Sequence, residues 1–533
     1  MTNSFSAPAF GRGVRRALAA TAATVLGAGI ALAGVTGPAA AAGYTGPHPG
    51  AFTGQGFDTC AAPSSATMKA WLASPYRALG IYIGGVNRGC AQANLTKAWV
   101  TTQAAAGWRF FPLYVGLQAP CSTYSRTIDP AQAAAQGRAA ADDAATRAGD
   151  LGLARDSTVF YDMETYPTGD AACTAAVNAF VSAWTMRLHD HGYLSGLYGK
   201  MTTGAVTDQV DAYRQPTHAS PDYLDFARWD GVATVTDPGL PESHWAPKRR
   251  MKQYQGDHHE TWGGVTLNID SDYLDLAPLP STGFADFTGN GWADVAYREP
   301  STTQLHVYGG NGTTLRGRVT ISAGWNGLDA IVRAGNFDRA GGEDLLAREK
   351  STGYLWLYPG TGSGITTRIR VGSGWNAFKE ITPVGDLDGD GNQDIVAVQT
   401  ATGALYFYPG RGGTFGARVL LAADGWNEVD ELAGGADLTG DGRPDLLARE
   451  ISTGDLRLYP GAGAGLGAPL TAGSGWGGMR DLVQTGDFDR DGRPDLVAVE
   501  TSTGNLLRYV WDGTAWLPPI RLGSGFGAMQ PLL

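Results

Sequence analysis

At 533 residues the chain is too long to fold around one hydrophobic core, so at least two domains are expected. The composition is that of a globular protein, with 43% hydrophobic residues, and the 77 glycines predict many turns. A net charge of −11 argues against binding to nucleic acid or to an anionic membrane surface unless divalent cations intervene.

The first 42 residues predict a secretory signal peptide. Three arginines precede an apolar run over residues 17–35, and the alanines at 40–42 supply the small residues that a signal peptidase needs. A membrane anchor is the alternative, but the run is rich in Ala and Gly and a little short of a stable span. We therefore expect a secreted, extracellular protein, and the pair Arg15-Arg16 leaves both Sec and twin-arginine export open.

From Gly54 onward, short apolar runs alternate with amphipathic stretches, which is the pattern of parallel βαβ units. The strand candidates are residues 55–59, 78–84, 108–116, 158–164, 194–199, 223–229, 250–255 and 265–270. The helix candidates are residues 64–73, 96–106, 130–148 and 172–190. This predicts an α/β fold, a (β/α)8 TIM barrel with its reactive groups at the carboxyl ends of the strands. A doubly wound open sheet is the alternative, but no Gly-rich phosphate loop supports it.

Two carboxylates end the fourth predicted strand. Asp162 and Glu164 are spaced i,i+2, so on a strand they point to the same side, about 7 Å apart. Two acids held close in a cleft push their pKa values apart, so that one can serve as a general acid while the other is an anion. Cleavage of a glycosidic bond requires this pairing. The alternative is that both acids are solvated loop residues beyond the strand.

The predicted barrel brings further side chains to the same mouth. Asp58 ends the first strand and Asp270 ends the eighth, and these strands are neighbours in a closed barrel. Aromatic and amide side chains near strand ends can hold a sugar ring, although for each one alone a core or rim position is the favoured interpretation. The candidates are Tyr114, Tyr198, Trp229, Gln253 and Tyr254.

The four cysteines each follow a predicted strand on that side of the barrel. Two disulfides are the expectation for an exported chain, and neighbouring loops predict Cys60–Cys90 and Cys121–Cys173, one of three possible connectivities. Zinc ligation is the competing interpretation, but no pair has the close spacing of a zinc knuckle.

Residues 54–276 resemble the bacterial secreted glycoside hydrolase-like domain, a relative of the family-25 lysozymes. The resemblance rests on Gly56-Phe57-Asp58, Asp162-Met163-Glu164, Lys252-Gln253-Tyr254, Gly264-Val265 and Asn268-Ile269-Asp270. It implies that Glu164 protonates the leaving oxygen and that Asp162 stabilises the developing positive charge or steers the attack. Asp58 and Asp270 would shape the site.

The second half of the chain consists of five repeats. Nine-residue loops begin at Asp286, Asn336, Asp386, Asp437 and Asp487, about 50 residues apart, and we call them loops one to five. This period in an all-β pattern predicts a five-bladed β-propeller of four-stranded blades, closed by residues 529–533 pairing with residues before Phe284. The expected divisions of the chain are a signal peptide (1–42), the barrel (43–276), a linker (277–283) and the propeller (284–533).

Four of the loops predict structural Ca²⁺ sites, since oxygens at positions one, three, five and nine with a glycine at position six can wrap this ion. The candidate ligands are Asp286, Thr288, Asn290 and Asp294; Asp386, Asp388, Asp390 and Asp394; Asp437, Thr439, Asp441 and Asp445; and Asp487, Asp489, Asp491 and Asp495. Loop two begins with Asn336 and carries Ala340 at position five, so weak or no binding is expected there. A calcium-free acidic turn is the alternative for each loop.

The repeats resemble the FG-GAP repeat of extracellular propellers, over all five units. Aromatic residues recur once per unit after a glycine, and packing between strands is favoured over ligand stacking because residues set by a repeat period are usually structural. These residues are Trp325, Trp375, Trp426, Trp476 and Phe526.

Together these features predict a secreted, monomeric enzyme that hydrolyses a cell-wall or environmental glycan by carboxylate general acid/base chemistry. No catalytic cofactor, nucleic acid or membrane insertion is expected, and the propeller would aid targeting. A non-catalytic glycan-binding or cell-surface interaction protein is the alternative. A purely structural protein would leave the four acids without a role.

Overall fold

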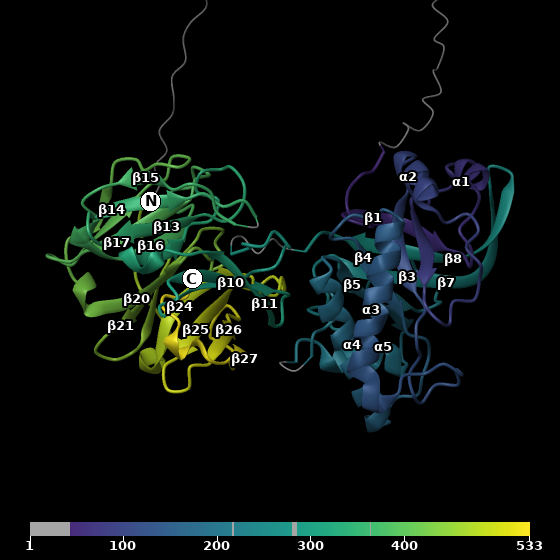
Figure 1. Ribbon diagram of the computed structural model, residues 1–533. Coiled ribbons are helices and arrows are strands. Elements are labelled where there is room, and N and C mark those ends of the chain that lie inside the picture. Colours follow the sequence, from purple (N-terminus) through teal and green to yellow (C-terminus); the bar gives the residue numbers. More distant parts are fainter. Residues whose placement is uncertain (1–42, 216–217, 280–284, 363) are drawn as a thin grey trace, which may run out of the picture. The chain divides into compact units, whose positions relative to one another are not determined.

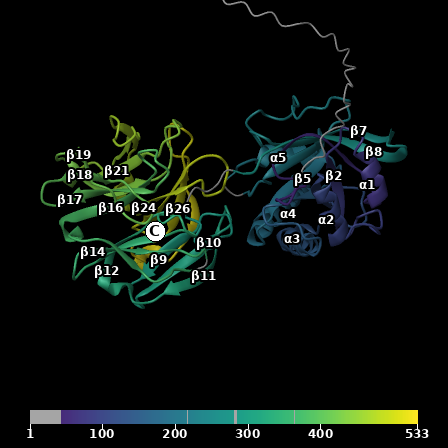
Figure 2. The same cartoon turned by 90° about the horizontal axis from the view of Figure 1, so that it is seen from above.

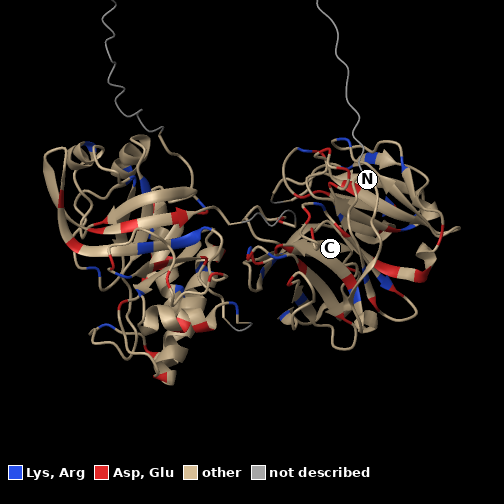
Figure 3. Ribbon diagram, turned by 180° about the vertical axis from the view of Figure 1, so that it is seen from behind, with Lys and Arg blue, Asp and Glu red and all other residues tan. Residues whose placement is uncertain are grey.

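The computed structural model describes residues 43–215, 218–279, 285–362 and 364–533 and contains a barrel and a propeller (Figures 1 and 2). The predicted signal peptide and part of the predicted linker lie outside the described residues. Acidic and basic residues are interspersed over both bodies (Figure 3).

Eight strands form a closed barrel in the order of the sequence. They are β1 (Phe52–Asp58), β2 (Ala78–Gly84), β3 (Arg109–Tyr114), β4 (Thr158–Asp162), β5 (Leu194–Lys200), β6 (Tyr223–Ala227), β7 (Arg249–Trp262) and β8 (Val265–Leu276). Neighbouring strands from β1 to β7 are parallel, whereas β8 is antiparallel to both β7 and β1. The barrel is therefore mixed.

Five α-helices connect the first six strands. They are α1 (Ser65–Trp71), α2 (Lys97–Ala105), α3 (Ala133–Asp150), α4 (Ala171–Asp190) and α5 (Gly204–Ala212), the last of which the sequence pattern did not reveal. Asp129 accepts a hydrogen bond from the Ala131 N–H and caps a 3₁₀ turn, η1 (Pro130–Gln132), that leads into α3. The long helices α3 and α4 lie side by side against the barrel (Figure 1).

The prediction of eight repeated strand-helix units is wrong in the last part of the barrel. Residues 228–248, all described, contain no helix, and β7 turns directly into β8 at Gly263-Gly264. Both glycines have positive φ angles, 57° and 81°, as a two-residue hairpin turn requires. A turn this short can join only antiparallel strands, because a parallel crossover needs a dozen or more residues.

The barrel interior changes from apolar to polar along its strands. Phe160 on β4, Tyr223 on β6 and Met251 on β7 belong to one buried apolar cluster. Two residues further along each of these strands, the same inward face carries a polar side chain, since alternate residues share a face. These side chains are Asp162, Asp225 and Gln253, and all of them are buried. The carboxyl-terminal end of the parallel strands is therefore the polar end.

The propeller has five sheets. Blade one contains β9 (Val295–Glu299), β10 (Gln304–Gly310) and β11 (Leu315–Ser322). Blade two contains β12 (Leu328–Arg333), β13 (Leu345–Glu349), β14 (Tyr354–Tyr358) and β15 (Ile369–Gly372). Blade three contains β16 (Phe378–Gly385), β17 (Asp394–Gln399), β18 (Ala404–Tyr408) and β19 (Val419–Ala422). Blade four contains β20 (Val429–Gly434), β21 (Leu446–Glu450), β22 (Leu456–Tyr459) and β23 (Leu470–Gly473). Blade five contains β24 (Met479–Gly486), β25 (Asp495–Glu500), β26 (Leu506–Val510) and β27 (Ile520–Gly523).

The end of the chain closes the ring, as expected, but with a different partner. The backbone of Leu533 exchanges two hydrogen bonds with that of Ala296 in β9, and Arg298 and Gln530 are also joined through their backbones. The predicted partner was the segment before Phe284, and residues 280–284 lie outside the described residues. Among the described residues, the partner is the three-stranded sheet of blade one. This sheet thereby gains a fourth segment.

The recurring aromatic residues are packing residues, as favoured from the repeat period. Each begins a 3₁₀ turn: η2 (Trp325–Gly327), η3 (Trp375–Ala377), η4 (Trp426–Glu428), η5 (Trp476–Gly478) and η6 (Phe526–Ala528). All five side chains are buried. Trp375, for example, has its ring centroid 4.7 Å from that of Tyr408. Arg348 of the preceding blade donates to the carbonyl oxygens of Trp375 and Phe378, so the turn also joins two blades.

Candidate functional site

The four predicted acids line one cavity at the polar end of the barrel. It has a volume of about 340 Å³, and Asp58, Asp162, Glu164 and Asp270 are all part of its wall. Asp58 and Asp162 lie at the ends of β1 and β4. A group of acids from three separate strands at one barrel mouth is the arrangement that the sequence predicted.

Asp270 reaches this cavity in an unexpected way. It lies within β8 instead of ending it, because β8 continues to Leu276. The antiparallel register pairs Asp270 directly with Asp58. A strand of reversed direction therefore places its carboxylate at the same level as the end of β1.

Gln253 on β7 connects the two acids to two aromatic residues. Its Nε2 donates to Asp58 Oδ2 at 3.0 Å and to Asp270 Oδ2 at 3.2 Å. Its Oε1 accepts from Tyr198 Oη at 3.0 Å and from Trp229 Nε1 at 2.9 Å. An indole N–H can only donate, so the orientation of this amide is determined by its partners. Gln253 is 3% exposed, and all four of its hydrogen bonds are made inside the protein.

Three of the five predicted sugar-binding residues therefore belong to one network beside the cavity. Trp229 is 62% exposed, so one face of its ring is available to a ligand. The other side of its ring covers Gly256, where an added Cβ would lie 2.2 Å from the indole. The network fixes an exposed aromatic surface relative to the carboxylates.

Two of the predicted sugar-binding residues lie away from the cavity. Tyr114 donates its hydroxyl to Asp143 of α3 at 2.8 Å, and its ring packs against Tyr161 and Trp184 between the barrel and the helices. Tyr254 is next to Gln253 on the same strand and so faces the opposite side. It is buried and is not part of the cavity wall. Tyr114 ends β3 as predicted, whereas Tyr254 lies within β7, which continues to Trp262. The direction of the side chain excludes both residues from the site.

Gln118 holds the backbone that carries the two central acids, and no sequence motif pointed to it. Its Nε2 donates to the carbonyl oxygen of Asp162 at 2.9 Å, and its Oε1 accepts from the Glu164 N–H at 2.7 Å. The side chain is completely buried. Gln118 therefore fixes the chain just beyond the end of β4, where Glu164 projects into the cavity.

The electrostatics of the cavity favour protonated carboxyl groups. Burial, together with the charge of Asp270, raises the pKa of Asp58 to about 7, against the hydrogen bonds from Tyr82 and Gln253. Burial raises the pKa of Asp162 well above its usual value, and the charge of Glu164 adds to this. The pKa of Glu164 is also raised, again mainly by burial. At neutral pH this group of acids therefore retains protons that isolated carboxylates would have released.

Two further acids lie in the barrel interior next to the site. Asp225 on β6 is 2% exposed and Asp272 on β8 is 1% exposed. Neither oxygen of Asp272 has a hydrogen-bond partner. Burial raises the pKa of both well above the usual value, and the charge of Asp58 contributes in each case. The sequence spacing could have revealed Asp272, because it follows Asp270 by two residues and therefore shares the inward face of the strand.

Both predicted disulfides are present beside the cavity. Cys60–Cys90 joins the loops after β1 and β2, with a Cα–Cα distance of 5.7 Å. Cys121–Cys173 joins the loop after β3 to the first turn of α4, with a Cα–Cα distance of 5.9 Å. The first disulfide is part of the cavity wall. Covalent links of this kind restrict the loops that form the rim.

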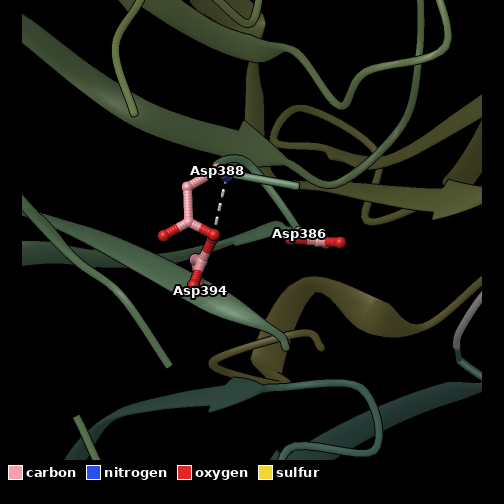
Figure 4. A group of neighbouring side chains, drawn as sticks. All are labelled: Asp386, Asp388 and Asp394. Atoms are coloured by element: carbon pink, nitrogen blue, oxygen red, sulfur yellow. Dashed lines mark hydrogen bonds between the residues drawn. The ribbon is translucent and has the colours of Figure 1, made fainter. Parts of the chain in front are cut away.

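In the propeller, loop three brings three carboxylates together. Three side chains, Asp386, Asp388 and Asp394, each contribute one carboxylate oxygen, and these three oxygens lie within 4.8 Å of one another (Figure 4). Asp386 Oδ1 is buried without a hydrogen-bond partner. Asp390, the candidate ligand at position five, instead pairs with Arg411, whose side chain is about half exposed. Oxygens with this spacing and an unused lone pair fit a divalent cation.

The aspartate at position nine also has a structural role. Asp394 Oδ1 accepts from the Gly410 N–H at 2.7 Å, and Oδ2 accepts from the Leu387 N–H at 2.8 Å. Asp344 of loop two likewise accepts from the N–H groups of Gly360 and Asp338, which correspond to Gly410 and Asp388 of loop three, although loop two has alanine at position five. The position-nine aspartate therefore organises the loop whether or not the other ligands are present.

Loops one and four have carboxylates that are already engaged. Both oxygens of Asp286 accept N–H groups of loop one, from Asn290 and Gly291. Both oxygens of Asp437 likewise accept N–H groups of loop four, at Gly440 and Gly442. Among the described loops, loop three thus offers the most complete set of oxygens at positions one, three and nine.

Among the described residues, no helix combines the length and apolar character needed to cross a membrane.

Comparison with family models finds two matches. Residues 69–274 match the "Rv2525c-like, glycoside hydrolase-like domain". Residues 386–448 and 437–498 each match the "FG-GAP-like repeat". No curated protein matches the chain.

Solved structures similar to the chain include three bacterial proteins. The spore cortex lytic enzyme SleM of Clostridium perfringens is 15% identical over 60% of this chain and 96% of its own, with a TM-score of 0.32. A family 25 glycosyl hydrolase from Bacillus anthracis is 13% identical over 41% of this chain and 88% of its own, with a TM-score of 0.27. An uncharacterised B. stearothermophilus protein is 19% identical over 42% of this chain and 95% of its own, with a TM-score of 0.28.

Proposed function

We propose, on the premise that this chain joins a glycoside hydrolase-like domain to FG-GAP-like repeats, that its barrel hydrolyses the glycosidic bonds of a cell-wall or environmental glycan. The observation that carries this proposal is the cavity shared by Asp58, Asp162, Glu164 and Asp270. Hydrolysis of a glycosidic bond needs a proton donor and an anion near the same bond.

Glu164 is the proposed general acid. Of the two acids at the end of β4 it is the more exposed, and burial raises its pKa, which favours the protonated form that a general acid needs. The charge of Glu164 is one reason why the pKa of Asp162 is high, so Asp162 ionises more readily while Glu164 is protonated. In its ionised form Asp162 would stabilise the positive charge that develops on the sugar, or it would steer the attack on the sugar.

Asp58 and Asp270 form the opposite wall, held by Gln253. A sugar ring bound to the exposed face of Trp229 would be placed relative to these acids through the same amide. Sugar rings pack on aromatic faces through their apolar C–H surfaces, and Trp229 offers such a face at the rim.

The test is release of reducing ends from purified cell-wall glycan by the full chain. The variant Glu164→Gln keeps the size of the side chain but cannot donate the proton, and its rate should fall about 100-fold or more. Glu242→Gln, at an exposed loop position outside the cavity wall, is the matched control and should keep full activity. Equal rates for Glu164→Gln and the parent would remove the mechanism. Glycan binding by the parent without release would favour the non-catalytic alternative.

The propeller is proposed to bind Ca²⁺ as a structural ion in loop three and to target the barrel to its glycan. The support is the three carboxylate oxygens of loop three and the unpartnered Oδ1 of Asp386. The ion would supply the positive charge that balances Asp386, Asp388 and Asp394. Export to an oxidising compartment is proposed from the two disulfides and from the signal-like first 42 residues.

A further inference from the structure

Loop five matches the calcium pattern in sequence but differs from the other loops in its hydrogen bonds. In blades one to four, a glycine N–H donates to Oδ1 of the position-nine aspartate; the glycines are Gly310, Gly360, Gly410 and Gly461. In blade five the equivalent residue is Trp511, and its N–H donates to the carbonyl oxygen of Pro494. Asp495 Oδ1 is left buried without a partner.

The physical reason is the close approach that only glycine permits. A Cβ added to Gly410 would lie 2.0 Å from the carbonyl oxygen of Gln393, and one added to Gly310 would lie 1.9 Å from that of Ala293. A side chain at this position therefore forces the backbone away. The N–H of Trp511 therefore cannot donate to Asp495 Oδ1 in the way that the glycine N–H groups donate to the position-nine aspartates of the other blades. Loop five thus lacks one of the hydrogen bonds that stabilise the other loops.

An arginine occupies the space near these carboxylates instead. Arg508 Nη1 lies 2.8 Å from Asp489 Oδ2 and 3.8 Å from Asp495 Oδ2, which are the acids at positions three and nine. Arg508 is 5% exposed. The sheet registers place it opposite Val497, at the position that other blades fill with buried apolar residues. Those residues are Val307, Leu357, Phe407 and Leu458.

We infer that Arg508 is the resident cation of loop five, so that the propeller binds Ca²⁺ in loop three but not in loop five. The inference rests on the proposed calcium site of loop three. In loop three, the carboxylates that lie close together include the aspartate at position nine, Asp394. In loop five, the carboxylates that lie close together are Asp487, Asp489 and Asp491, and the position-nine residue Asp495 is not among them. Position nine of loop five faces the guanidinium instead.

The nearest arginine of loop three differs in one decisive way. Arg411 is about half exposed, and its charge can return to water when a metal ion enters. Arg508 is buried, and an ion that displaced it from Asp489 would leave a buried guanidinium without its partner. Breaking a buried ion pair by removing one partner is strongly unfavourable. Loop five is therefore closed to a second cation.

The test is calorimetric titration of the full chain with Ca²⁺ after treatment with chelator. The variants Asp390→Ala and Asp491→Ala remove the position-five acid from loops three and five, and both copy the alanine found naturally in loop two. Asp390→Ala should weaken calcium binding at least about 10-fold, whereas Asp491→Ala should leave stoichiometry and affinity unchanged. Loss of a bound ion in Asp491→Ala would overturn the inference.

A second pair of variants tests the role of the arginine directly. Arg508→Leu, which copies Leu458 of blade four, should raise the stoichiometry by one ion and make the melting temperature more dependent on calcium. Arg508→Lys keeps the charge and should add no ion. An unchanged stoichiometry in Arg508→Leu, with calcium-dependent melting equal to that of the parent, would overturn the inference. If Asp390→Ala changes nothing, the calcium site of loop three fails, while the Arg508 variants still decide the state of loop five.

Discussion

Asp58 on β1 and Asp270 on β8 lie opposite each other in an antiparallel register, and a single amide nitrogen, Nε2 of Gln253, donates to both. This relationship closes the barrel and forms one wall of the cavity at the same time. It also links the acids to Trp229, because the other end of the same amide accepts the indole N–H. Four predictions follow from this site and from the propeller loops.

Gln253→Leu is expected to lower kcat/KM at least about 10-fold and to shift the pH profile of the reaction upward. Removing the amide takes one donor from Asp58, and because that hydrogen bond lowers the pKa of Asp58, its loss raises the pKa from its present value of about 7. Measurement of kcat/KM against pH checks this. Gln255→Leu, at an exposed position on the same strand, is the control. An unchanged profile in Gln253→Leu would mean that the bridge does not influence the reacting groups.

Trp229→Ala is expected to raise KM about 10-fold, which corresponds to about 1.4 kcal/mol, with little change in kcat. The side chain is largely exposed, so its removal should change substrate binding more than folding. Trp229→Phe retains an aromatic face but loses the N–H that donates to Gln253. Recovery of KM in Trp229→Phe would identify ring contact as the contribution. A KM equal to that of the parent in Trp229→Ala would exclude the ring from the binding surface.

Asp272→Asn is expected to stabilise the barrel at pH 8 and to have less effect at pH 4. Burial raises the pKa of this carboxyl above its unfolded value, so the folded barrel binds more protons than the unfolded chain. The free energy of unfolding therefore falls as the pH rises above the ordinary Asp value of about 4. Facing groups that also titrate are Asp58, Asp225 and Asp270.

Thermal unfolding of the Asp272→Asn variant measures this effect. A gain of 1 kcal/mol would raise the melting temperature by about 2–4 °C in a domain of this size. Asp211→Asn on α5 changes an exposed carboxyl and should leave the curve unaltered at both pH values. A variant that is less stable than the parent at pH 8 would show that Asp272 is needed in its ionised form.

Calcium removal is expected to lower the melting temperature of the propeller. An ion that binds only the folded state stabilises it by about 2.7 kcal/mol when its concentration is 100 times Kd. Calorimetric scans with 1 mM Ca²⁺ and with excess chelator should therefore differ, and Asp386→Ala should abolish the difference. Asn336→Ala in loop two should retain it. A transition that does not respond to chelator in the parent would refute the metal site.

Local patterns were sufficient for much of the barrel. The alternation of apolar runs located all eight strands, because burial on a sheet imposes a period that can be read directly. The last two strands are longer than predicted, since β7 continues to Trp262 and β8 to Leu276. Cysteine positions relative to those strands were enough for both disulfides. The direction of β8 was missed, although the turn at Gly263-Gly264 contained the relevant signal. A two-residue connection cannot join parallel strands, and the repeated pattern of the earlier units concealed this.

The sequence by itself determined which chemical groups this protein has at its strand ends and how often its propeller motif recurs. Only the tertiary structure decided which of those groups share a cavity, since Tyr114 at the end of β3 bonds to Asp143 of α3 outside the barrel, whereas Gln253 within β7 bonds to Asp58 of the cavity wall. It also decided that Arg508, which follows Asp495 by 13 residues and Asp489 by 19, lies among the carboxylates of loop five. Side-chain direction and contacts between distant segments depend on packing, and packing is not encoded in any short stretch of the chain.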